Sequence, residues 1–475
     1  MPFPLKGGKG QDNGNNSTNP MKNNEIMNTA VIGGGYAGMA AAVRLAEQDI
    51  PVTVFESARQ LGGRARGISC GKTQLDNGQH LLLGCYHQTL ALIEQVGGNI
   101  AEDFLRLPLQ LDLHGHFALK APRLPAPFHL LFALLFARGL SLAERLSAAR
   151  FMQAMKNNNF KIIKDISVSS LLSEHKQSPA LVQKFWEPLC IAALNTPLRI
   201  ASARVLLNVL KDALNQTRSD SDMLLPRIDF TALFPARAAK YVRRRGGHVL
   251  TSCGVEQLLP HERGFEIITK RGSLFFSHVI CATPPVTTAR LLRSCAALAP
   301  VIAQINALQH QPVYTLYLQY PKSVRLPHPM LGLHQRYSQW LFDKGQIAEQ
   351  CGLIAAVISA EGLHQELSQN ELAQKVIAEL REEFGFTETP RWYKVIAEKR
   401  ATFACTPDLS RPAQQTPLSN LLLAGDYTQG VYPATLEGAV QSGLRCAELL
   451  NTVILAPGLD AQAAEALRRI AGRTE

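Results

Sequence analysis

Uninterrupted apolar runs stand near both ends of the chain, and a glycine turn follows each of them. The run at 29–32 leads into a glycine-rich turn and an alanine-rich stretch, 40–48, and a second apolar run follows at 51–56. This order predicts a right-handed βαβ unit of about thirty residues. The other run, 421–424, precedes a second glycine turn and a further helical stretch. Short runs without polar residues are typical of parallel strands that are buried on both faces.

The sequence between these ends is expected to hold helices first and strands afterwards. Residues from about 105 to 230 contain few glycines and predict helices, around 125–139, 141–165, 178–194 and 200–215. Strand-like runs lie between 246 and 283, and 310–360 alternates apolar and polar positions, which predicts a second, antiparallel sheet. An amphipathic helix is expected at 371–384, where one face carries Leu372, Val376, Ile377 and Leu380.

The expected fold class is α/β, in a two-domain α+β arrangement. A chain of 475 residues is long enough for a Rossmann-type nucleotide-binding domain with a mixed α/β substrate domain inserted into it in pieces. The nucleotide domain is expected to comprise 27–105, 230–285 and 395–455, and the substrate domain 106–229 and 286–394. Residues 1–26, rich in Asn, Gly, Lys and Pro, are expected to be a disordered extension, and 456–475 a C-terminal tail.

The net charge of +11 raises three interpretations. Nucleic acid is the first, but basic residues are scattered apart from Arg243-Arg244-Arg245 and no nucleic-acid motif is found, so no nucleic-acid partner is expected. A surface that faces anionic lipid and solvated charge without a specific partner both stay open.

The cysteines and the apolar runs bear on the cellular location. Nine cysteines without a Cys-x-x-Cys pair predict reduced thiols in a cytoplasmic protein, without a disulfide scaffold or a metal site. No run approaches the ~20 apolar residues that a bilayer crossing requires.

The first glycine turn has the spacing of a dinucleotide fingerprint. Gly33 allows the tight turn, Gly35 lets the backbone approach a pyrophosphate, and Gly38 lets the helix pack closely on the strand. The pyrophosphate would lie over the free N–H groups at the helix N-terminus. An acid at the end of the second strand, Glu56, is placed to accept hydrogen bonds from ribose hydroxyls. The intervening or adjacent residues Tyr36, Ala37 and Ser57 belong to the same predicted site. A glycine turn that only packs two elements is the structural alternative.

Two later segments favour FAD over NAD. Gly62-Gly63-Arg64 offers backbone amides and a guanidinium to a second phosphate charge. Gly425-Asp426 follows the apolar run at 421–424, and Asp426 can bond a ribityl hydroxyl. The helix that starts near Ala434, Thr435 and Leu436 can direct its N-terminus at the flavin, where its dipole would stabilise a reduced, anionic ring. A buried strand and turn without a ligand is the alternative reading of 421–426.

This combination resembles the FAD-dependent amine oxidase and phytoene desaturase superfamily. The segment 416–443, TPLSNLLLAGDYTQGVYPATLEGAVQSG, is similar to the C-terminal signature of plant-type carotene desaturases. Three others resemble the bacterial hydroxysqualene dehydroxylases of that superfamily: DNGQH at 76–80 with the following LLLG, WEPLCIAALNTP at 186–197, and EKRATF at 398–403. The resemblance covers about 27–452 and implies an amine-oxidase-like fold, with the backbone of Val255 against the adenine.

The resemblance also implies a reaction. A long-chain isoprenoid, hydroxysqualene, would lose its hydroxyl reductively to give squalene for hopanoid or sterol synthesis. Alternatives are a phytoene or carotenoid desaturase and a flavin-binding lipid carrier without catalysis. The flavin-linking cysteine and aromatic cage of mammalian monoamine oxidases are not evident, so non-covalent FAD is expected. No second complete fingerprint for a nicotinamide nucleotide is present, and the electron donor is not named by the sequence.

The proton that such a reaction needs has four candidate sources or positioning groups. His80 ranks first because the unperturbed pKa of histidine lies near physiological pH. A histidine that bonds a backbone carbonyl is the alternative role. Asp76 could instead order its loop, Glu437 lies in the first turn of the flavin-facing helix, where acids are favoured in any case, and Tyr432 could lie beside the flavin or serve packing.

The most apolar stretch of the chain is 121–140. Its run of about eight apolar residues is too short to span a bilayer and fits an interfacial segment that dips into one leaflet. A buried core helix is the alternative. The first interpretation predicts a cytoplasmic enzyme in peripheral contact with the lipid of the inner membrane.

Overall fold

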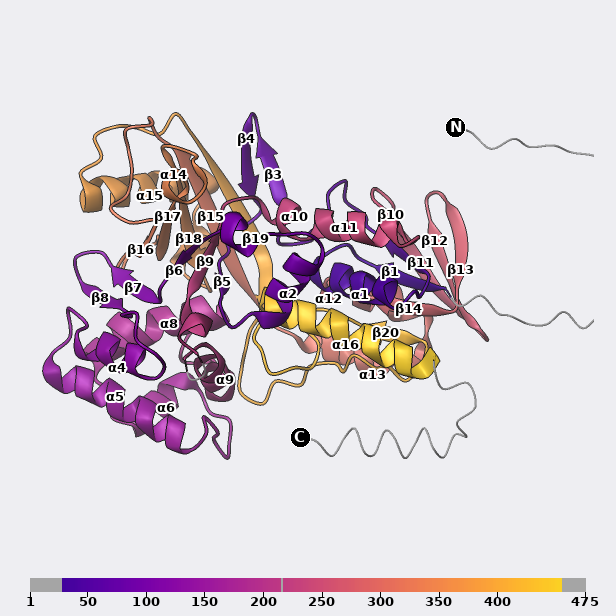
Figure 1. Ribbon diagram of the computed structural model, residues 1–475, viewed down its shortest axis with the longest axis horizontal. Helices are drawn as coiled ribbons and strands as arrows, with labels where there is room; N and C mark the ends of the chain where they lie inside the picture. Colours follow the sequence, from indigo (N-terminus) through magenta and orange to yellow (C-terminus); the bar gives the residue numbers. More distant parts are fainter. Residues whose placement is uncertain (1–27, 215–216, 455–475) are drawn as a thin grey trace, which may run out of the picture.

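The computed structural model describes residues 28–214 and 217–454. Figure 1 shows an elongated molecule, with a parallel sheet and its helices at one end and a larger mixed sheet with a helical lobe at the other. The disordered extension expected at 1–26 and the tail expected at 456–475 lie outside the described residues.

A five-stranded parallel sheet with strand order β10-β2-β1-β14-β20 forms the nucleotide half. Its apolar runs are buried on both faces: Val31 and Ile280 join one core cluster, whereas Ile32 and Cys281 join another. Helices α1, α11 and α16 cover the first face (Figure 1). The elements are β1 (Thr29–Ile32), α1 (Tyr36–Glu47), β2 (Val52–Phe55), α11 (Pro235–Arg244), β10 (His248–Leu250), β14 (His278–Cys281), β20 (Leu421–Leu423) and α16 (Leu436–Ile454).

The first and last of these helices pack closely together. A Cβ atom added to Gly443 of α16 would lie 2.0 Å from the carbonyl oxygen of Ala37 in α1, so only glycine allows this approach. The opposite face of the sheet is covered by a three-stranded antiparallel sheet and two helices, where Phe55 meets Phe276 edge to face. These elements are β11 (Val255–His261), β12 (Gly264–Thr269), β13 (Gly272–Phe276), α12 (Pro285–Leu291) and α13 (Ala299–Ala307).

A seven-stranded sheet with the order β19-β15-β18-β17-β16-β7-β8 forms the centre of the other half. The amphipathic helix expected at 371–384 is confirmed as α15, whose Leu372, Val376 and Leu380 are buried against this sheet. The elements are β7 (Gln110–Leu113), β8 (Phe117–Lys120), β15 (His310–Gln319), β16 (Met330–Gly332), β17 (Trp340–Asp343), α14 (Lys344–Ala348), β18 (Leu353–Ser359), α15 (Gln369–Phe384) and β19 (Trp392–Phe403).

The expectation of helices alone between 105 and 230 is wrong at both ends of that stretch. β7 and β8 belong to the large sheet, and β9 (Met223–Pro226) pairs with β5 (Leu82–Leu83) and β6 (Phe104–Leu107). These strands have at most four residues, and the alternation that marks β7, with Leu111 and Leu113 buried, is too short to dominate a long window. The helices between them form a lobe of α4 (Phe128–Leu135), α5 (Leu142–Asn157), α6 (Val168–Glu174), α8 (Glu187–Leu194) and α9 (Ala203–Leu214).

The domain limits stay a prediction, and one of them divides a strand. The boundary expected at 395 falls inside β19, which runs on to Phe403 within the large sheet. Among the helices of residues 28–214 and 217–454, none has both the length and the apolarity that a membrane crossing requires.

Candidate active site

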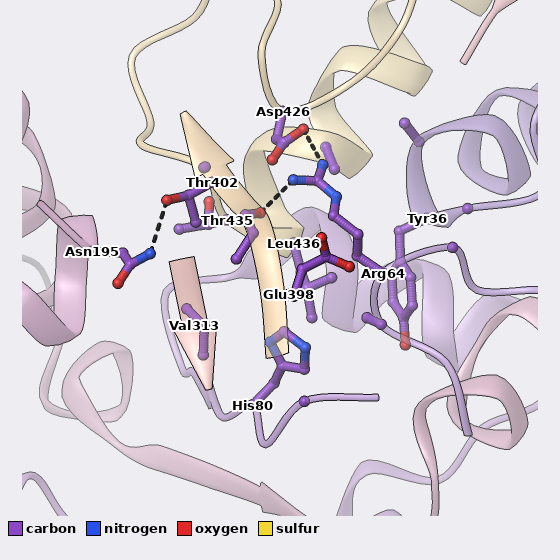
Figure 2. A pocket seen from close by; sticks show the side chains of 18 of the residues that line it. Tyr36, Arg64, His80, Asn195, Val313, Glu398, Thr402, Asp426, Thr435 and Leu436 are labelled. Carbon is purple, nitrogen blue, oxygen red and sulfur yellow. Dashed lines mark hydrogen bonds and ion pairs between the residues drawn. The ribbon is translucent and has the colours of Figure 1, made fainter. Parts of the chain in front are cut away.

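A cavity of about 840 Å³ lies between the two halves and is lined by segments from both. This volume is at the upper end of the usual range for small-molecule sites, about 300–1,000 Å³. Figure 2 shows side chains from the first glycine turn, the C-terminal turn, α8 and β19 directed toward it. One wall is formed where β1, β2 and β20 end, which is where α/β sheets bind their ligands.

Glycine is required at each fingerprint position of the first turn for a different physical reason. Gly33 has φ +112°, and a Cβ atom there would lie 2.5 Å from the carbonyl oxygen of Ala282. At Gly38 a Cβ atom would lie 2.0 Å from the carbonyl oxygen of Gly33, so this position serves the packing of the helix on the strand and does not line the cavity. At Gly35, by contrast, the nearest atom to an added Cβ is the Cα of Gly63, at 3.8 Å. A side chain at Gly35 would therefore occupy the cavity itself.

The N-terminus of α1 opens onto the same wall without a compensating charge. No side chain caps this helix, and its first turn contains no acidic residue. The positive end of the helix dipole and the free N–H groups therefore face the cavity beside Tyr36 and Ala37. Glu56 holds the turn in place, because its carboxylate accepts hydrogen bonds from the N–H groups of Gly34 and Ala58, both at 2.7 Å. Glu56 and Ser57 also line the cavity.

The second glycine loop adds a cation to this wall. Gly62 and Gly63 both line the cavity, and Gly62 bridges to Gly35. The guanidinium of Arg64 donates to Asp426 Oδ1 at 2.5 Å and to the carbonyl oxygen of Ala401. Burial acts to lower the pKa of Arg64, but the Asp426 carboxylate outweighs it and the pKa is raised. Asp426 was expected to bond a ribityl hydroxyl, and here its carboxylate is paired with Arg64.

The C-terminal turn completes the cofactor wall. Gly425, Ala434, Thr435 and Leu436 line the cavity, the last three around the N-terminus of α16, and Val255 lines it as well. Fifteen of the sixteen predicted cofactor residues thus line one cavity, with Gly38 behind it.

Glu437 is in the first turn of α16 but faces away from the cavity. Its carboxylate accepts hydrogen bonds from the N–H groups of Gln88 and Thr89 and from the Thr89 hydroxyl, and it is 1% exposed. Gln88 and Thr89 lie in the first turn of α2 (His87–Gln95), so Glu437 caps that helix. The prediction of Glu437 as an acid that faces substrate does not fit this geometry, because all of these contacts are structural.

Asp76 is also directed away from the cavity. Its Oδ1 accepts a hydrogen bond from the N–H of Phe230 at 2.9 Å, and its backbone carbonyl accepts one from the Tyr317 hydroxyl. Burial raises the pKa of Asp76 to about 7. The residue orders the loop that carries His80, and it is not among the cavity-lining residues. The prediction of Asp76 as an acid beside the substrate does not fit this position either.

His80 and Tyr432 do line the cavity. The His80 ring meets Phe230 edge-on, with centroids 5.1 Å apart. Burial, together with the positive charge of Arg64, lowers the pKa of His80 to about 4, so the ring is neutral at pH 7. Tyr432 donates its hydroxyl to Asp212 Oδ2 at 2.8 Å, and its pKa is raised by burial and by that carboxylate.

The opposite wall is mostly apolar and comes from distant parts of the chain. Its side chains include Leu109, Leu111, Leu189, Leu194, Leu210, Val313, Met330, Trp340, Phe342 and Val357. Polar side chains also line the cavity there, among them Asn195, Glu398 and Thr402. The sequence did not single these three out individually, although each lies in one of the two segments, 186–197 and 398–403, that carried the resemblance.

Asn195 fixes the geometry of this wall. It ends α8 in the left-handed region, at φ 48°, which asparagine tolerates better than most residues. Its amide donates to the carbonyl oxygen of Pro312 and to Thr402 Oγ1, at 3.2 and 3.0 Å, and accepts from the N–H of Ala360 at 2.7 Å. The register of β15 and β19 shifts beside these contacts, between Gln311 and Val313. Figure 2 shows Glu398 of β19 in the same region as His80 and Arg64.

The residues of the cofactor wall fit a long dinucleotide. The space in front of Gly35, the free N-terminus of α1 and the Arg64 cation suit a pyrophosphate, and the N-terminus of α16 suits a second polar end. Because the N-termini of two helices, α1 and α16, both open onto one cavity, this site defines a flavin-binding oxidoreductase.

Comparison with known proteins places the chain in a family. Residues 36–451 match the family of flavin containing amine oxidoreductases, and the chain belongs to that family. It is 26% identical to a hydroxysqualene dehydroxylase of Zymomonas mobilis, over 89% of this chain and 98% of that protein. It is 23% identical to the zeta-carotene desaturase of Arabidopsis thaliana, over 88% of this chain and 84% of that protein. The fold is similar to that of an oxidoreductase from Methanosarcina mazei, with a TM-score of 0.69 and 17% identity over 89% and 100% of the two chains.

The protein is therefore an FAD-dependent oxidoreductase with the fold of flavin amine oxidases. The predicted fold class, family and cofactor are confirmed.

Proposed function

We propose that the protein reductively removes the hydroxyl group of hydroxysqualene to give squalene. The observation that carries this proposal is the cavity, in which a cofactor wall lies opposite an apolar wall. The apolar wall is formed by residues of α8, α9, β7 and the other strands of the large sheet. Resemblance over nearly the full length of a hydroxysqualene dehydroxylase supports the same substrate class.

The reaction replaces a carbon–oxygen bond by a carbon–hydrogen bond. The hydroxyl oxygen takes up a proton and leaves as water with the bonding electron pair, and the allylic cation that remains accepts a hydride. Reduced FAD, when bound, supplies that hydride. The apolar wall, with Leu189, Leu210 and Trp340, would keep bulk water away from the cation, which water would otherwise capture.

We propose Glu398 as the proton donor in place of His80. A donor should expose a titratable oxygen or nitrogen to the cavity, and Asp76 and Glu437 do not line it. Burial and the positive charge of Arg64 hold the His80 ring neutral, which suits a hydrogen bond to the substrate, whereas Glu398 places a carboxyl in the same region of the cavity. As the donor, Glu398 would pass a proton to the hydroxyl oxygen, and its carboxylate would then face the developing cation. Neutral His80 would hold the hydroxyl by a hydrogen bond.

Non-covalent attachment of FAD is part of the proposal. Among the described residues that line the cavity, Cys85 is the one cysteine, and burial raises the pKa of its thiol to about 12. A thiol that stays protonated is a poor nucleophile toward the flavin ring. Denaturation should release all of the flavin from the protein.

An anaerobic half-reaction tests the proposal. Photoreduced holoenzyme mixed with hydroxysqualene should return the flavin to its oxidised spectrum and release squalene in equal amount. A reduced spectrum that persists, with no squalene formed, would exclude dehydroxylation.

Desaturation is the second candidate, because zeta-carotene desaturases also match most of the chain. The same cavity would then transfer hydride in the opposite direction, from a carotenoid precursor to oxidised flavin. Anaerobic bleaching of the oxidised enzyme by phytoene or zeta-carotene, but not by squalene, would support this alternative.

A further inference from the structure

The helical lobe exposes an unusual number of large apolar side chains. Eight of the fourteen exposed large hydrophobic residues among those described lie between 124 and 163. In α4, Phe128, Leu131 and Phe132 follow the spacing of one helix face, and Phe136 continues it with 73% of its surface exposed. The alternative of a buried core helix at 121–140 is therefore wrong, because only the inner face of α4, with His129, Ala133 and Leu134, is buried.

The neighbouring helix α5 extends this surface. Leu142 and Leu146 lie one turn apart on its outer face, with 66% and 39% of their surfaces exposed. We call the set of Phe128, Leu131, Phe132, Phe136, Leu142 and Leu146 the apolar patch. Exposed apolar groups gathered in this way mark an interaction site more often than single exposed residues do.

Positive charge is concentrated in the segment of the chain that carries the patch. Residues 120–164 contain eight Lys and Arg against one Glu, a net charge of +7 out of +11 for the whole chain. Exposed members are Lys120, Arg123, Arg138, Arg150, Lys156, Lys161 and Lys164, and none of these seven forms an ion pair with another described residue. The single acid, Glu144, is engaged with Ser141 and Ser178.

The occupant that fits both features is an anionic lipid bilayer. Phe and Leu on one face with Lys and Arg around them are typical of helices that lie in a membrane interface. Lysine is depleted in protein–protein interfaces, so a protein partner fits the patch less well.

The inner side of α4 connects this surface with the active site. His129 is fully buried, and its Nε2 lies 3.3 Å from the Oγ of Ser221, which lines the cavity. One helix thus separates the apolar patch from the wall of the cavity. Figure 1 places α4 and α5 at the end of the molecule away from β10 and β11, so docking there leaves the nucleotide half free.

We propose that the apolar patch on α4 and α5 docks on an anionic bilayer and that the substrate enters the cavity from the bilayer past α4. The docking surface is independent of the reaction, whereas the entry route rests on the proposed isoprenoid substrate.

Vesicle flotation with the full-length holoenzyme tests the docking. The protein should float with vesicles of phosphatidylcholine and phosphatidylglycerol, less with phosphatidylcholine alone, and less as salt is added. The double variant Phe132→Ser/Phe136→Ser should bind anionic vesicles with an affinity reduced by roughly tenfold or more, because two rings that insert into the bilayer are lost. Leu274→Ser/Phe275→Ser, in exposed β13, is the matched control and should bind like the wild type.

The contribution of the exposed basic residues of 120–164 is tested by a second pair of variants. Arg138→Gln/Arg150→Gln should weaken binding to anionic vesicles and reduce its dependence on salt, whereas Lys240→Gln/Arg244→Gln, exposed on α11, should not. An unchanged flavin spectrum shows that each variant is folded. Wild-type protein that stays unbound, or patch variants that float like the wild type, would overturn the proposal. Loss of self-association in the patch variant without any vesicle binding would assign the surface to a second copy and overturn it as well.

Turnover measurements distinguish a failure of the docking and entry proposal from a failure of the proposed reaction. The patch variant should keep wild-type turnover of hydroxysqualene dispersed in detergent and lose it with substrate supplied in vesicles. Equal turnover of vesicle-borne substrate by variant and wild type would overturn entry past α4, and wild-type inactivity in detergent would count against the reaction alone.

Discussion

The cofactor wall of the cavity is built largely from backbone, whereas the opposite wall is built from side chains. On the cofactor side, glycines and two helix N-termini present N–H groups, and single side chains such as Glu56 hold the turns in place. On the other side, leucines and aromatic residues from α8, α9, β7 and the other strands of the large sheet line the cavity. Asn195 holds β15 and β19 in place by hydrogen bonds.

This difference teaches where specificity can change. A backbone wall requires a particular conformation, so substitutions there alter cofactor binding abruptly. A side-chain wall can be reshaped one residue at a time, because each apolar group contributes its own volume. A hydroxysqualene dehydroxylase and a zeta-carotene desaturase are both similar to this chain over most of its length, which fits a fixed cofactor site and a variable substrate site.

The largest effect is expected at the backbone wall, for Gly35→Val. The side chain would fill the space in front of α1 while meeting no protein atom closer than 3.8 Å at its Cβ, so the apoprotein should fold and bind almost no flavin. Flavin content and far-UV circular dichroism measure the two properties, and Gly35→Ala should fall between. Retention of wild-type flavin content by the valine variant would refute a pyrophosphate at this position.

The side-chain wall should respond differently to Glu398→Gln. We expect roughly a 10²- to 10⁴-fold loss of turnover with unchanged flavin content, since one proton donor is removed. Glu437→Gln is the matched control: it should destabilise the fold by about 1–2 kcal/mol through α2 but preserve turnover per folded molecule. If Glu398→Gln turned over normally, another group would have to donate the proton.

His80 allows a test by pH. Its pKa is about 4 in the folded protein against 6.5 unperturbed, so the unfolded chain takes up a proton first as the pH falls. Stability is unaffected above 6.5 and should decrease by up to about 3 kcal/mol between pH 6.5 and 4. In urea unfolding series, His80→Gln should lose this part of the pH dependence. Parallel curves for variant and wild type would mean that the ring is not held neutral.

A smaller effect is expected where the two walls meet, for Arg64→Met. Asp426 is 7% exposed and would lose its cation, which should lower the free energy of unfolding of the apoprotein by about 2 kcal/mol. Arg445→Met breaks an exposed pair on α16 and should cost less than about 0.5 kcal/mol. Equal effects of the two substitutions in denaturant titrations would show that the Arg64 pair contributes no more than a surface pair.

The sequence was informative for the cofactor wall because the signals there are local. Glycine spacing, an apolar strand and an acid at its end lie within thirty residues, and Gly35 and Glu56 could be placed from them. Asn195 and Glu398 could not, because only the folded chain brings α8 to β19, as in the contact of Asn195 with Thr402, 207 residues away along the chain. Asp76 and Glu437 were assigned by their nearness in sequence to predicted site residues, and the direction of a side chain is set by packing that such nearness does not report.

The close contact between α1 and α16 has a consequence for how the protein is made. A ribosome releases β1, α1 and the first glycine turn long before the last strand of their sheet and the helix that packs at Gly443, which follow nearly four hundred residues later. Until β20 and α16 have been made, the parallel sheet is incomplete and its apolar surface stays exposed. The flavin site therefore forms only after α16 has been made, and a bound flavin distinguishes chains that include α16 from shorter ones.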